Sequence, residues 1–313
     1  MTKVLITGGA GFIGSHLTER LLAAGDEVVV VDNFSTSRRD SLTPHDKLTV
    51  VEGTIADPEL VAKAFAFGPE LVVHAAASYK DPAAWAEDSR TNVVGSSNVV
   101  QAAEQAGAGR IIYLQTALCY GIKPLEQPIT LSHPLRPYDS SYAISKTAGE
   151  HYVQLGSVPS VSFRLANVYG PRNLSGPLPT FFHRLTNDKP CFVMDTRRDF
   201  VFVDDLVDLL MIALSGTGEP GAYHASSGSD FSIQELYDAT IAALGLPAHD
   251  VEVRERGEDD AFSILLDPAK TIETFGWTTS TPLVDGVAKA IAWYREYGVE
   301  QTFTHLKLPE VRA

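Results

Sequence analysis

The sequence predicts an α/β protein with a Rossmann-type, doubly wound parallel sheet and a smaller α/β second lobe. Three observations indicate this fold. Short apolar runs alternate with helical patterns through the first half, the runs are apolar throughout and rich in Val and Ile, and a glycine-rich turn directly follows the first run. Continuously apolar strands separated by helices are typical of a parallel sheet that is covered by helices on both faces.

Each element follows from such a pattern, in chain order. Six runs are expected to be buried strands: KVLITGG, DEVVVVDN, KLTVVEG, LVVHAAA, RIIYLQT and VPSVSFRLAN. Helical patterns lie between them at residues 15–24, 57–65, 92–106 and 142–155. After Asn167 the Gly/Pro loop YGPRNLSGPLP introduces shorter elements, with strands near CFVM, FVFV and VEVRER. We therefore expect a first domain at 1–168, joined by about 200–224 and 261–270, and a second lobe formed by 169–199, 225–260 and 271–313.

Composition narrows the class of protein. The chain has 313 residues, 44% of them hydrophobic, which is enough to bury a sizeable core. Its net charge of -14 argues against a nucleic acid or an anionic membrane as partner, because both require a basic surface. Two cysteines, Cys119 and Cys191, fit a reducing compartment, and neither a signal segment nor a long apolar run is visible. We expect a cytoplasmic globular protein, and no metal site is expected.

The stretch TGGAGFIG predicts a dinucleotide site. It follows the first strand and opens a helix, and Gly8, Gly11 and Gly14 are spaced three apart. Glycines are needed where the backbone must approach a pyrophosphate at a helix N-terminus. Asp32 ends the second strand, where a carboxylate can accept the adenine ribose hydroxyls and would repel a 2′-phosphate, so NAD is favoured over NADP. Arg38 and Arg39, which could accommodate NADP, are interpreted as part of a solvated loop.

A second motif predicts the chemistry. Tyr142 and Lys146 of SSYAISKTAGE are four apart and so share one helix face, where an ammonium can favour a phenolate. Thr116 falls at the carboxyl end of the fifth strand, where open α/β sheets bind ligands. The three side chains make a hydroxyl, a titratable phenol and a cation. His74, also at a strand end, is interpreted as a structural hydrogen-bonding group rather than a base.

With these motifs the chain resembles an extended short-chain dehydrogenase/reductase of the nucleotide-sugar epimerase and dehydratase family over nearly its whole length. The matching elements are TGGAGFIG, VDN, HAAA, Asn92, TALCYG, SSYAISK, RLANVYGP, RRDFVFVDD and GW. The resemblance implies NAD as cofactor and a UDP-sugar as substrate. The residues that it assigns to the cofactor are Gly8, Gly11, Phe12, Ile13, Gly14, Asp32, Asn33, Ser35, Thr36, Thr54, Ile55, Ala75, Ala76, Ala77, Asn92, Tyr142 and Lys146.

The same resemblance implies how the reaction begins. The family's tyrosine removes the proton of the sugar 4-hydroxyl while the C4 hydride passes to NAD, and Thr116 hydrogen-bonds the 4-oxygen. A free phenol has a pKa of about 10, so work near pH 7 needs that pKa lowered by about 3, or roughly 4 kcal/mol. Lys146 and the cationic nicotinamide are both expected to stabilise the phenolate.

The residues after Thr116 bear on which reaction follows. By resemblance, 4,6-dehydratases place Asp and Glu directly after this threonine, and uronate decarboxylases place a Glu two positions after theirs. The 3,5-epimerase/reductases place a reactive cysteine two positions after. Here those positions are Ala117 and Leu118, which cannot transfer protons, and Cys119 is interpreted as a packing residue. We therefore expect 4-epimerisation, with NAD regenerated in each cycle and tightly retained.

The substrate residues are implied by resemblance alone. They are Thr116, Asn167, Arg172, Gly176, Arg198, Arg256 and Asp259, with GPLPTFF from Gly176 passing main chain along the uracil. An alternative is that Arg198 only braces its loop with Asp199. A sugar 6-carboxylate could be met by Arg172, Arg184 and Arg197, although uronate 4-epimerases carry an arginine where this chain has Leu174. The two candidate substrates, UDP-glucuronate and UDP-glucose, are almost equally favoured, with a slight preference for UDP-glucuronate. The sequence does not determine the C2 and C6 substituents of the sugar.

Other functions are alternatives to 4-epimerisation. A non-catalytic NAD-binding sensor could share the fold but would have no reason to keep Thr116, Tyr142 and Lys146 together. A dehydratase would need an acid and a base from elsewhere in the cleft, and a net reductase would exchange its NAD with added NADH. By resemblance, the outer faces of the two helices that begin at Asn92 and Tyr142 often form a dimer interface, so a homodimer is expected.

Overall fold

A computed structural model describes residues 1–302, apart from residues 80, 249 and 258–259. In this part of the chain seven strands form one parallel sheet in the order β11-β6-β5-β4-β1-β2-β3. Its members are β1 (Lys3–Thr7), β2 (Glu27–Asp32), β3 (Leu48–Glu52), β4 (Leu71–His74), β5 (Arg110–Thr116), β6 (Ser160–Leu165) and β11 (Gly221–Ala225). The strand order reverses between β1 and β4, which is where such sheets bind ligands. The predicted Rossmann-type fold is confirmed.

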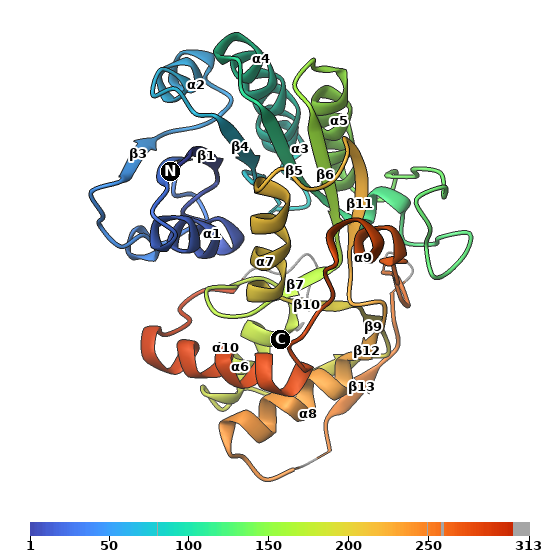
Figure 1. Cartoon of the computed structure of the whole chain (residues 1–313). Coiled ribbons are helices and arrows are strands. Elements are labelled where there is room, and N and C mark those ends of the chain that lie inside the picture. The colour runs from blue at the N-terminus through green and yellow to red at the C-terminus, as the bar shows by residue number, and fades with distance from the viewer. Residues whose placement is uncertain (80, 249, 258–259, 303–313) are drawn as a thin grey trace.

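Helices cover both faces of this sheet (Figure 1). Successive side chains of a strand point to opposite faces, so Val4 and Ile6 of β1 join one buried cluster while Leu5 joins another. The first cluster is closed by α1 (Phe12–Ala23), α7 (Val203–Leu214) and α9 (Ala269–Phe275). The second is closed by α2 (Pro58–Phe65), α4 (Ser96–Ala106) and α5 (Ser141–Leu155). Burial on both faces explains why the strands are apolar throughout.

Local signals set where two of these helices begin. The Asp57 carboxylate accepts hydrogen bonds from the backbone N–H groups of Glu59 and Leu60 at the start of α2. The Ser140 hydroxyl accepts one from Ala143 N–H at the start of α5. Each satisfies a first-turn donor that has no partner within its helix. The cap at Ser140 fixes the first turn of α5, which carries Tyr142 and is followed one turn later by Lys146.

The helix expected at 92–106 begins earlier than the sequence pattern suggested. It starts with α3 (Trp85–Asp88), continues through the π-helical turn η2 (Ser89–Gly95) and only then becomes α4. The hydroxyl of Ser96 donates to the Asn92 carbonyl at 2.6 Å. A Cβ added to Gly149 of α5 would lie 2.6 Å from the same carbonyl, so α5 packs against this turn at a position that only glycine allows.

Among the described residues, the second lobe contains three short strand pairs, with helices packed beside them (Figure 1). The pairs are β7 (Asn167–Tyr169) with β10 (Phe200–Phe202), β8 (Phe192–Met194) with β13 (Glu252–Arg254), and β9 (Arg197–Arg198) with β12 (Phe231–Ser232). The helices are α6 (Pro177–Leu185), α8 (Ile233–Leu244) and α10 (Leu283–Tyr297). The strands expected at CFVM, FVFV and VEVRER are confirmed. Two 3-10 turns, η1 (Arg39–Ser41) and η3 (Ala117–Tyr120), follow β2 and β5. Among the described residues, every helix is too short or too polar to cross a bilayer.

Candidate active site

The glycine-rich turn packs as closely as its sequence predicts. Gly8 has φ +69°, and a Cβ there would lie 2.8 Å from the backbone of Ala76. A Cβ on Gly14 would lie 2.2 Å from the Gly8 carbonyl oxygen. Any larger residue would therefore push α1 away from the turn after β1. The first N–H groups of α1 face the carboxyl end of the sheet, in the position expected of a pyrophosphate site.

Asp32 ties the turn after β2 to the glycine loop. Its carboxylate accepts hydrogen bonds from Ala10 N–H at 3.0 Å, Phe34 N–H at 2.8 Å and the Ser37 hydroxyl at 2.9 Å. A carboxylate has about four acceptor positions, so one remains for a ribose hydroxyl. The hydroxyl of Ser37 is a partner that the sequence did not single out.

The other predicted cofactor residues line the same end of the sheet. The backbone N–H groups of Ala75 and Ala76 donate to Thr7 at 3.1 and 3.2 Å, which fixes the turn after β4 beside β1. The hydroxyl of Thr54 accepts from Ala56 N–H at 3.2 Å. Near them Asn33, Ser35 and Thr36 belong to the segment after β2, and Phe12, Ile13, Ile55 and Ala77 complete the set.

Asn92 braces the segment after β4 against α5. Its side chain accepts from Ser78 N–H at 2.8 Å, and it donates to the Ser78 carbonyl and to the Ser145 hydroxyl, each at 3.0 Å. Ser145 directly precedes Lys146. His74 is buried and bonds Thr7 and Ser96 at 2.7 and 2.9 Å, and burial lowers its pKa to about 3. A neutral, doubly bonded imidazole confirms the structural interpretation of His74.

Thr116, Tyr142 and Lys146 come together at the carboxyl ends of β5 and the start of α5. The Thr116 side chain lies close enough to the Tyr142 hydroxyl to lower its pKa. Lys146 is only 2% exposed, and its Nζ lies 4.1 Å from the centroid of the Tyr113 ring. The predicted set is thus assembled from two elements, with the cation enclosed and lying over the face of an aromatic ring.

The protein's own groups move the two pKa values in opposite directions. Burial raises the pKa of Tyr142, the nearby Tyr79 and Asp88 raise it further, and the side chain of Thr116 lowers it. Burial lowers the pKa of Lys146 to about 7, against the effect of Glu150. The lowered phenol pKa expected from the sequence is therefore not produced by the neighbours of Tyr142, because desolvation outweighs them. A positive charge must supply it.

A buried polar network that the sequence analysis missed supports this set. Gln115 accepts from Thr116 N–H at 2.8 Å and donates to the Lys146 carbonyl at 3.1 Å and to Glu150 at 3.3 Å. The Glu150 carboxylate, which is fully buried, forms a two-pronged ion pair with Arg164 at 3.2 Å. An arginine within the apolar strand run SVSFRL is the one signal that could have indicated such a pair.

The network extends from Arg164 to Tyr120 and His224, and the donor and acceptor of each of its hydrogen bonds can be assigned. Arg164 donates to the Tyr120 hydroxyl at 2.7 Å, and that hydroxyl lies 2.6 Å from Nε2 of His224. Nδ1 of His224 lies 2.8 Å from the carbonyl of Asp267, so it must carry the proton, and Nε2 must accept from Tyr120. Cys119 beside Tyr120 is fully buried and burial raises its pKa, which confirms it as a packing residue.

Arg198 and Arg256 both bond Asp260 in the second lobe, Arg198 at its carboxylate and Arg256 at its backbone carbonyl. Arg198 pairs with Asp260 at 2.7 Å and donates to the Ala261 carbonyl at 2.9 Å, while Arg256 donates to the Asp260 carbonyl at 2.8 Å. The alternative that Arg198 braces Asp199 is wrong, because Asp199 bonds Ser226 and Ser227 instead. Among the described residues, Oδ2 of Asp260 has no hydrogen-bond partner. Asp259, another of the predicted substrate residues, lies outside the described residues.

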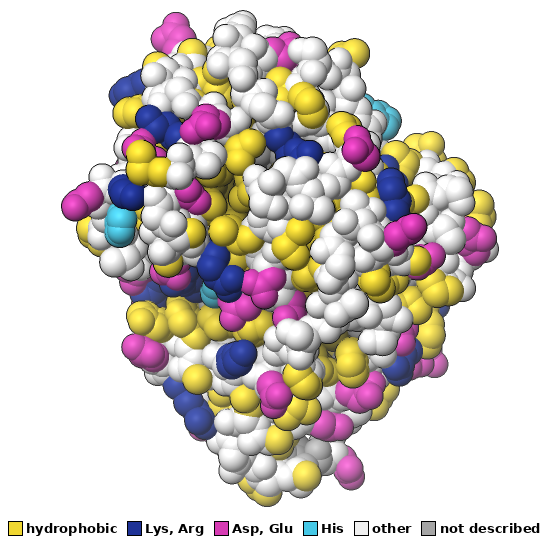
Figure 2. Space-filling view, in the orientation of Figure 1, with side chains coloured by type: hydrophobic (Ala, Val, Ile, Leu, Met, Phe, Trp, Pro, Cys, Tyr) yellow, Lys and Arg dark blue, Asp and Glu magenta, His cyan; other side chains and the backbone are white. Residues whose placement is uncertain are grey.

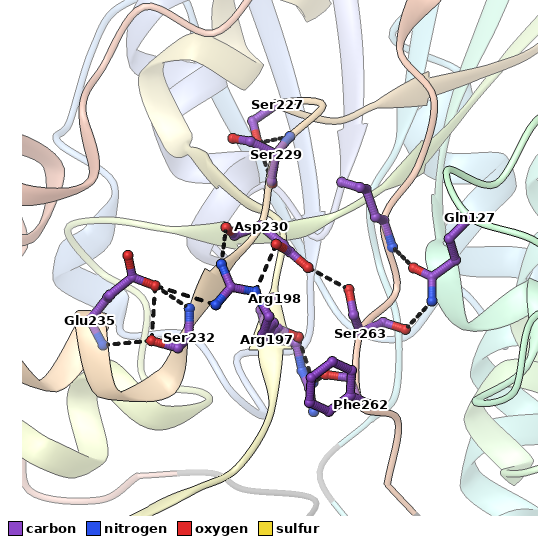
Figure 3. Close-up of polar contacts among 11 residues, drawn as sticks. Gln127, Arg197, Arg198, Ser227, Ser229, Asp230, Ser232, Glu235, Phe262 and Ser263 are labelled. Carbon is purple, nitrogen blue, oxygen red and sulfur yellow. Dashed lines mark hydrogen bonds and ion pairs between the residues drawn. The ribbon is translucent and has the colours of Figure 1, made fainter.

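The three arginines considered for a sugar carboxylate lie apart from one another. Arg197 donates to Asp230 at 2.8 Å and lies 3.7 Å from Glu235, while Ser263 donates to the same Asp230 (Figure 3). Arg184 donates to the Pro190 carbonyl at 2.6 Å. Both guanidinium groups are thus already occupied by acceptors of the protein.

Arg172 does not lie with Arg198. It has φ +68° and donates to the Ser15 hydroxyl at 3.1 Å and to Glu19 at 2.6 Å, both on α1. It lines a pocket with Ala10 of the glycine loop. The structure therefore brings Arg172 to the nucleotide end of the site, where basic and acidic side chains gather between the lobes (Figure 2).

The other two substrate-side predictions lie in the second lobe near its junction with the sheet. The Asn167 side-chain amide donates to the Asp199 carbonyl at 3.4 Å. Gly176, at φ +89°, directly precedes α6. The main chain expected to follow a uracil is thus the first turn of a helix that begins with Pro177, rather than an extended strand.

Comparison with known proteins agrees with this geometry. The chain matches the model of the NAD dependent epimerase/dehydratase family over residues 4–225. It is 33% identical over 315 residues to a UDP-glucose 4-epimerase of Mycolicibacterium smegmatis, with 94% of this chain and 98% of the relative covered. It is similar to the Bordetella bronchiseptica enzyme WbmH in complex with NAD+, at TM-score 0.93 and 56% identity, covering 96% and 100% of the two chains. For the Bordetella bronchiseptica enzyme WbmG in complex with NAD and UDP, the TM-score is 0.90 at 45% identity, covering 98% and 99%.

Proposed function

The chain belongs to the NAD-dependent epimerase/dehydratase family, and from that premise we propose that it catalyses the 4-epimerisation of a UDP-hexose through a transient 4-keto sugar. The favoured reactions are UDP-glucuronate to UDP-galacturonate and UDP-glucose to UDP-galactose. The observation that carries the proposal is the grouping of Thr116, Tyr142 and Lys146 beside two residues, Ala117 and Leu118, that cannot transfer protons.

The residues present fit the cofactor NAD. Backbone atoms occupy the space that a Cβ on Gly8 or Gly14 would need, so only glycine lets this turn pack so closely at the start of α1. The first N–H groups of α1 can then bind a pyrophosphate. Asp32 keeps an acceptor position for the ribose hydroxyls. When bound, NAD supplies the two-electron oxidation at C4 and its reversal. We propose that the cofactor contacts follow the seventeen residues that the family resemblance assigns.

Three side chains then carry the proton chemistry. Tyr142 takes the proton of the sugar 4-hydroxyl and returns it to the 4-oxygen after the keto sugar has presented its other face. Thr116 hydrogen-bonds the same oxygen as its charge changes, and its closeness to the Tyr142 hydroxyl supports this placement. Lys146 and NAD+ together would supply the positive charge that is needed to offset the raised pKa of Tyr142.

The residues beside Thr116 favour epimerisation over dehydration. Leu118 N–H donates to the Thr116 hydroxyl at 3.2 Å, so the turn η3 orients Thr116 and offers no acid or base of its own next to it. Elimination of water from C5 and C6 needs both an acid and a base. Epimerisation needs only the return of the same proton and hydride, so the set already described is sufficient.

We propose that the UDP moiety lies in the second lobe between α6 and Asp260. Arg198 and Arg256 provide positive charge there for a pyrophosphate in an otherwise acidic protein, with Asn167 and Gly176 on the sugar and uridine side. Arg197 is neutralised by Asp230 and Glu235, whereas Arg184 bonds only a neutral carbonyl, so the contacts of these two arginines do not decide whether the sugar carries a carboxylate. The preference between glucuronate and glucose therefore rests on direct comparison of the two substrates.

We further propose a cytoplasmic homodimer with the lobe boundaries expected from the sequence. Both cysteines are free, as a reducing compartment requires. Exposed apolar side chains follow one face of α5 at Ile144, Tyr152 and Leu155. Light scattering should show a dimer that Leu155→Glu dissociates. The matched change at another exposed leucine, Leu125→Glu in a loop, should leave it intact, and equal behaviour of the two variants would refute the interface.

The test of the function uses the purified protein without added NAD. We would incubate it with UDP-glucuronate and UDP-glucose separately, and resolve the products by anion-exchange chromatography and proton NMR. The expected result is the matching galacto-configured nucleotide, and the faster substrate identifies the C6 group. A stable 4-keto or dehydrated product without any C4 epimer would overturn the proposal and favour the dehydratase alternative.

A further inference from the structure

The segment after β2, residues 33–41, lies across the nucleotide end of the site and is held at several points. The Ser37 hydroxyl donates to Asp32, and Thr36 lines one pocket with Tyr79 of the segment after β4. Phe34 adopts φ +53°, which is uncommon for a residue other than glycine and indicates a conformation held by its surroundings. These contacts attach the segment to the first domain.

Arg38 attaches the same segment to the second lobe. Its Nη1 donates to the carbonyl of Tyr297 at 3.2 Å, across 259 positions of sequence. Tyr297 is the last residue of α10, where carbonyl groups have no partner within the helix and the helix dipole favours a cation. Asp40 holds the guanidinium in place by two bonds of 2.8 and 2.6 Å, and this carboxylate raises the pKa of Arg38.

The pocket behind this contact has walls from both parts of the molecule. Ala10 and Phe12 of the glycine loop form one side, Thr36 and Arg38 another, and Arg172 and Trp293 of the second lobe the third. Trp293 stacks on Tyr297 at a centroid distance of 4.9 Å, so the end of α10 is packed rather than free. A dinucleotide whose pyrophosphate lies at the glycine loop passes beneath the 33–41 segment.

We propose that Arg38 retains the cofactor, because its bond to the Tyr297 carbonyl fastens the 33–41 segment across the two lobes and NAD leaves only after that bond opens. The proposal goes beyond the reaction and does not depend on which sugar is epimerised. It requires only that NAD binds at the glycine loop, as in the family to which the chain belongs. Arg38 is a retaining residue here, and it has no part in the chemistry at C4.

The neighbouring arginine offers a matched control. Arg39 belongs to the same segment and carries the same charge. It donates instead to Glu52, at the end of the edge strand β3, at 2.8 Å, and it lies 4.5 Å from the centroid of the Phe34 ring. It is absent from the walls of the pocket as far as the structure describes them. Arg39→Ala therefore removes a charge and a guanidinium from the segment without opening the bond across the lobes.

The experiment measures release of resident NAD from Arg38→Ala, Arg39→Ala and wild-type protein. Each protein is diluted into a solution of an enzyme that consumes free NAD. The NAD that remains bound is then separated by rapid gel filtration and quantified over time. Loss of one hydrogen bond of this kind predicts release about three- to tenfold faster for Arg38→Ala and unchanged release for Arg39→Ala. Thermal denaturation of the three proteins, run in parallel, identifies a variant that has lost its fold, and Arg38→Lys then replaces it.

Two results would overturn the proposal. One is equal release from Arg38→Ala and either wild type or Arg39→Ala. The other concerns charge: if Arg38 acted only by attracting the cofactor phosphates, high salt would raise the wild-type rate to that of Arg38→Ala. A bond to a neutral carbonyl is screened far less, so the difference between the two proteins should persist in high salt.

Discussion

Breaking the buried ion pair between Arg164 and Glu150 should destabilise the protein more than any change on its surface. Glu150 is 0% exposed and Arg164 is 6% exposed, so either group left alone would be a buried, unpaired charge. Removing one partner of such a pair costs about 3–5 kcal/mol. We therefore expect both Arg164→Met and Glu150→Leu to lose that amount of unfolding free energy.

The double variant should recover most of the loss. Replacing both charges by apolar side chains of similar volume removes the unpaired group, and such replacements are about neutral or stabilising. The donor bonds of Tyr120 to His224 and of Gln115 to the Lys146 carbonyl remain in the double variant. The two single losses should therefore fail to add by about 3 kcal/mol or more.

Urea unfolding followed by circular dichroism measures the four free energies. All four proteins are compared at one fixed excess of NAD, because ligand binding contributes to apparent stability. The slope of free energy against urea should stay constant across the set, which checks two-state behaviour. Single losses below about 1 kcal/mol, or a double loss equal to the sum of the two, would refute the assignment of this pair as buried and coupled.

Three further outcomes follow from the structure. Tyr142→Phe should lower epimerase turnover by about 10²–10⁴-fold while NAD still copurifies, as steady-state assay and nucleotide analysis would show. Gly14→Ala should reduce both NAD content and melting temperature, since its Cβ would lie 2.2 Å from the Gly8 carbonyl oxygen; undiminished NAD would contradict the close packing. Burial lowers the pKa of His224 to about 4, so below pH 6.5 the unfolded chain binds the extra proton and stability falls towards pH 4. His224→Gln should make urea midpoints in that window less pH-dependent, and an unchanged slope would exclude His224 as a contributor.

The parts of the site that the sequence predicted are those whose chemistry is local. The glycine spacing and the Tyr142–Lys146 spacing each lie within a single turn and helix, so residue types at fixed offsets carry the information. The strands were predicted for a similar reason, because burial on both faces requires an unbroken apolar run. Thr116 was found from its place at the end of such a run.

The missed parts depend on contacts between distant segments. Glu150 and Arg164 each look like an isolated charge in an amphipathic helix or a strand, and only packing of α5 on the sheet makes them a pair. Arg172 was expected at the sugar, but its φ of +68° turns it back towards α1. The π turn at Asn92 has the same apolar periodicity as an ordinary helix, so no pattern in the sequence reveals it.

The late position of the edge strand β11 in the sequence affects how the sheet forms while the chain is being synthesised. It pairs along Val161–Leu165 of β6, but it is made only after about 55 residues of intervening chain, most of which belong to the second lobe. A nascent chain that has completed β6 therefore presents an open strand edge beside the apolar Phe163 until residue 225 has left the ribosome. Products truncated within this interval carry that open edge permanently, and their fate is association with other chains rather than independent folding.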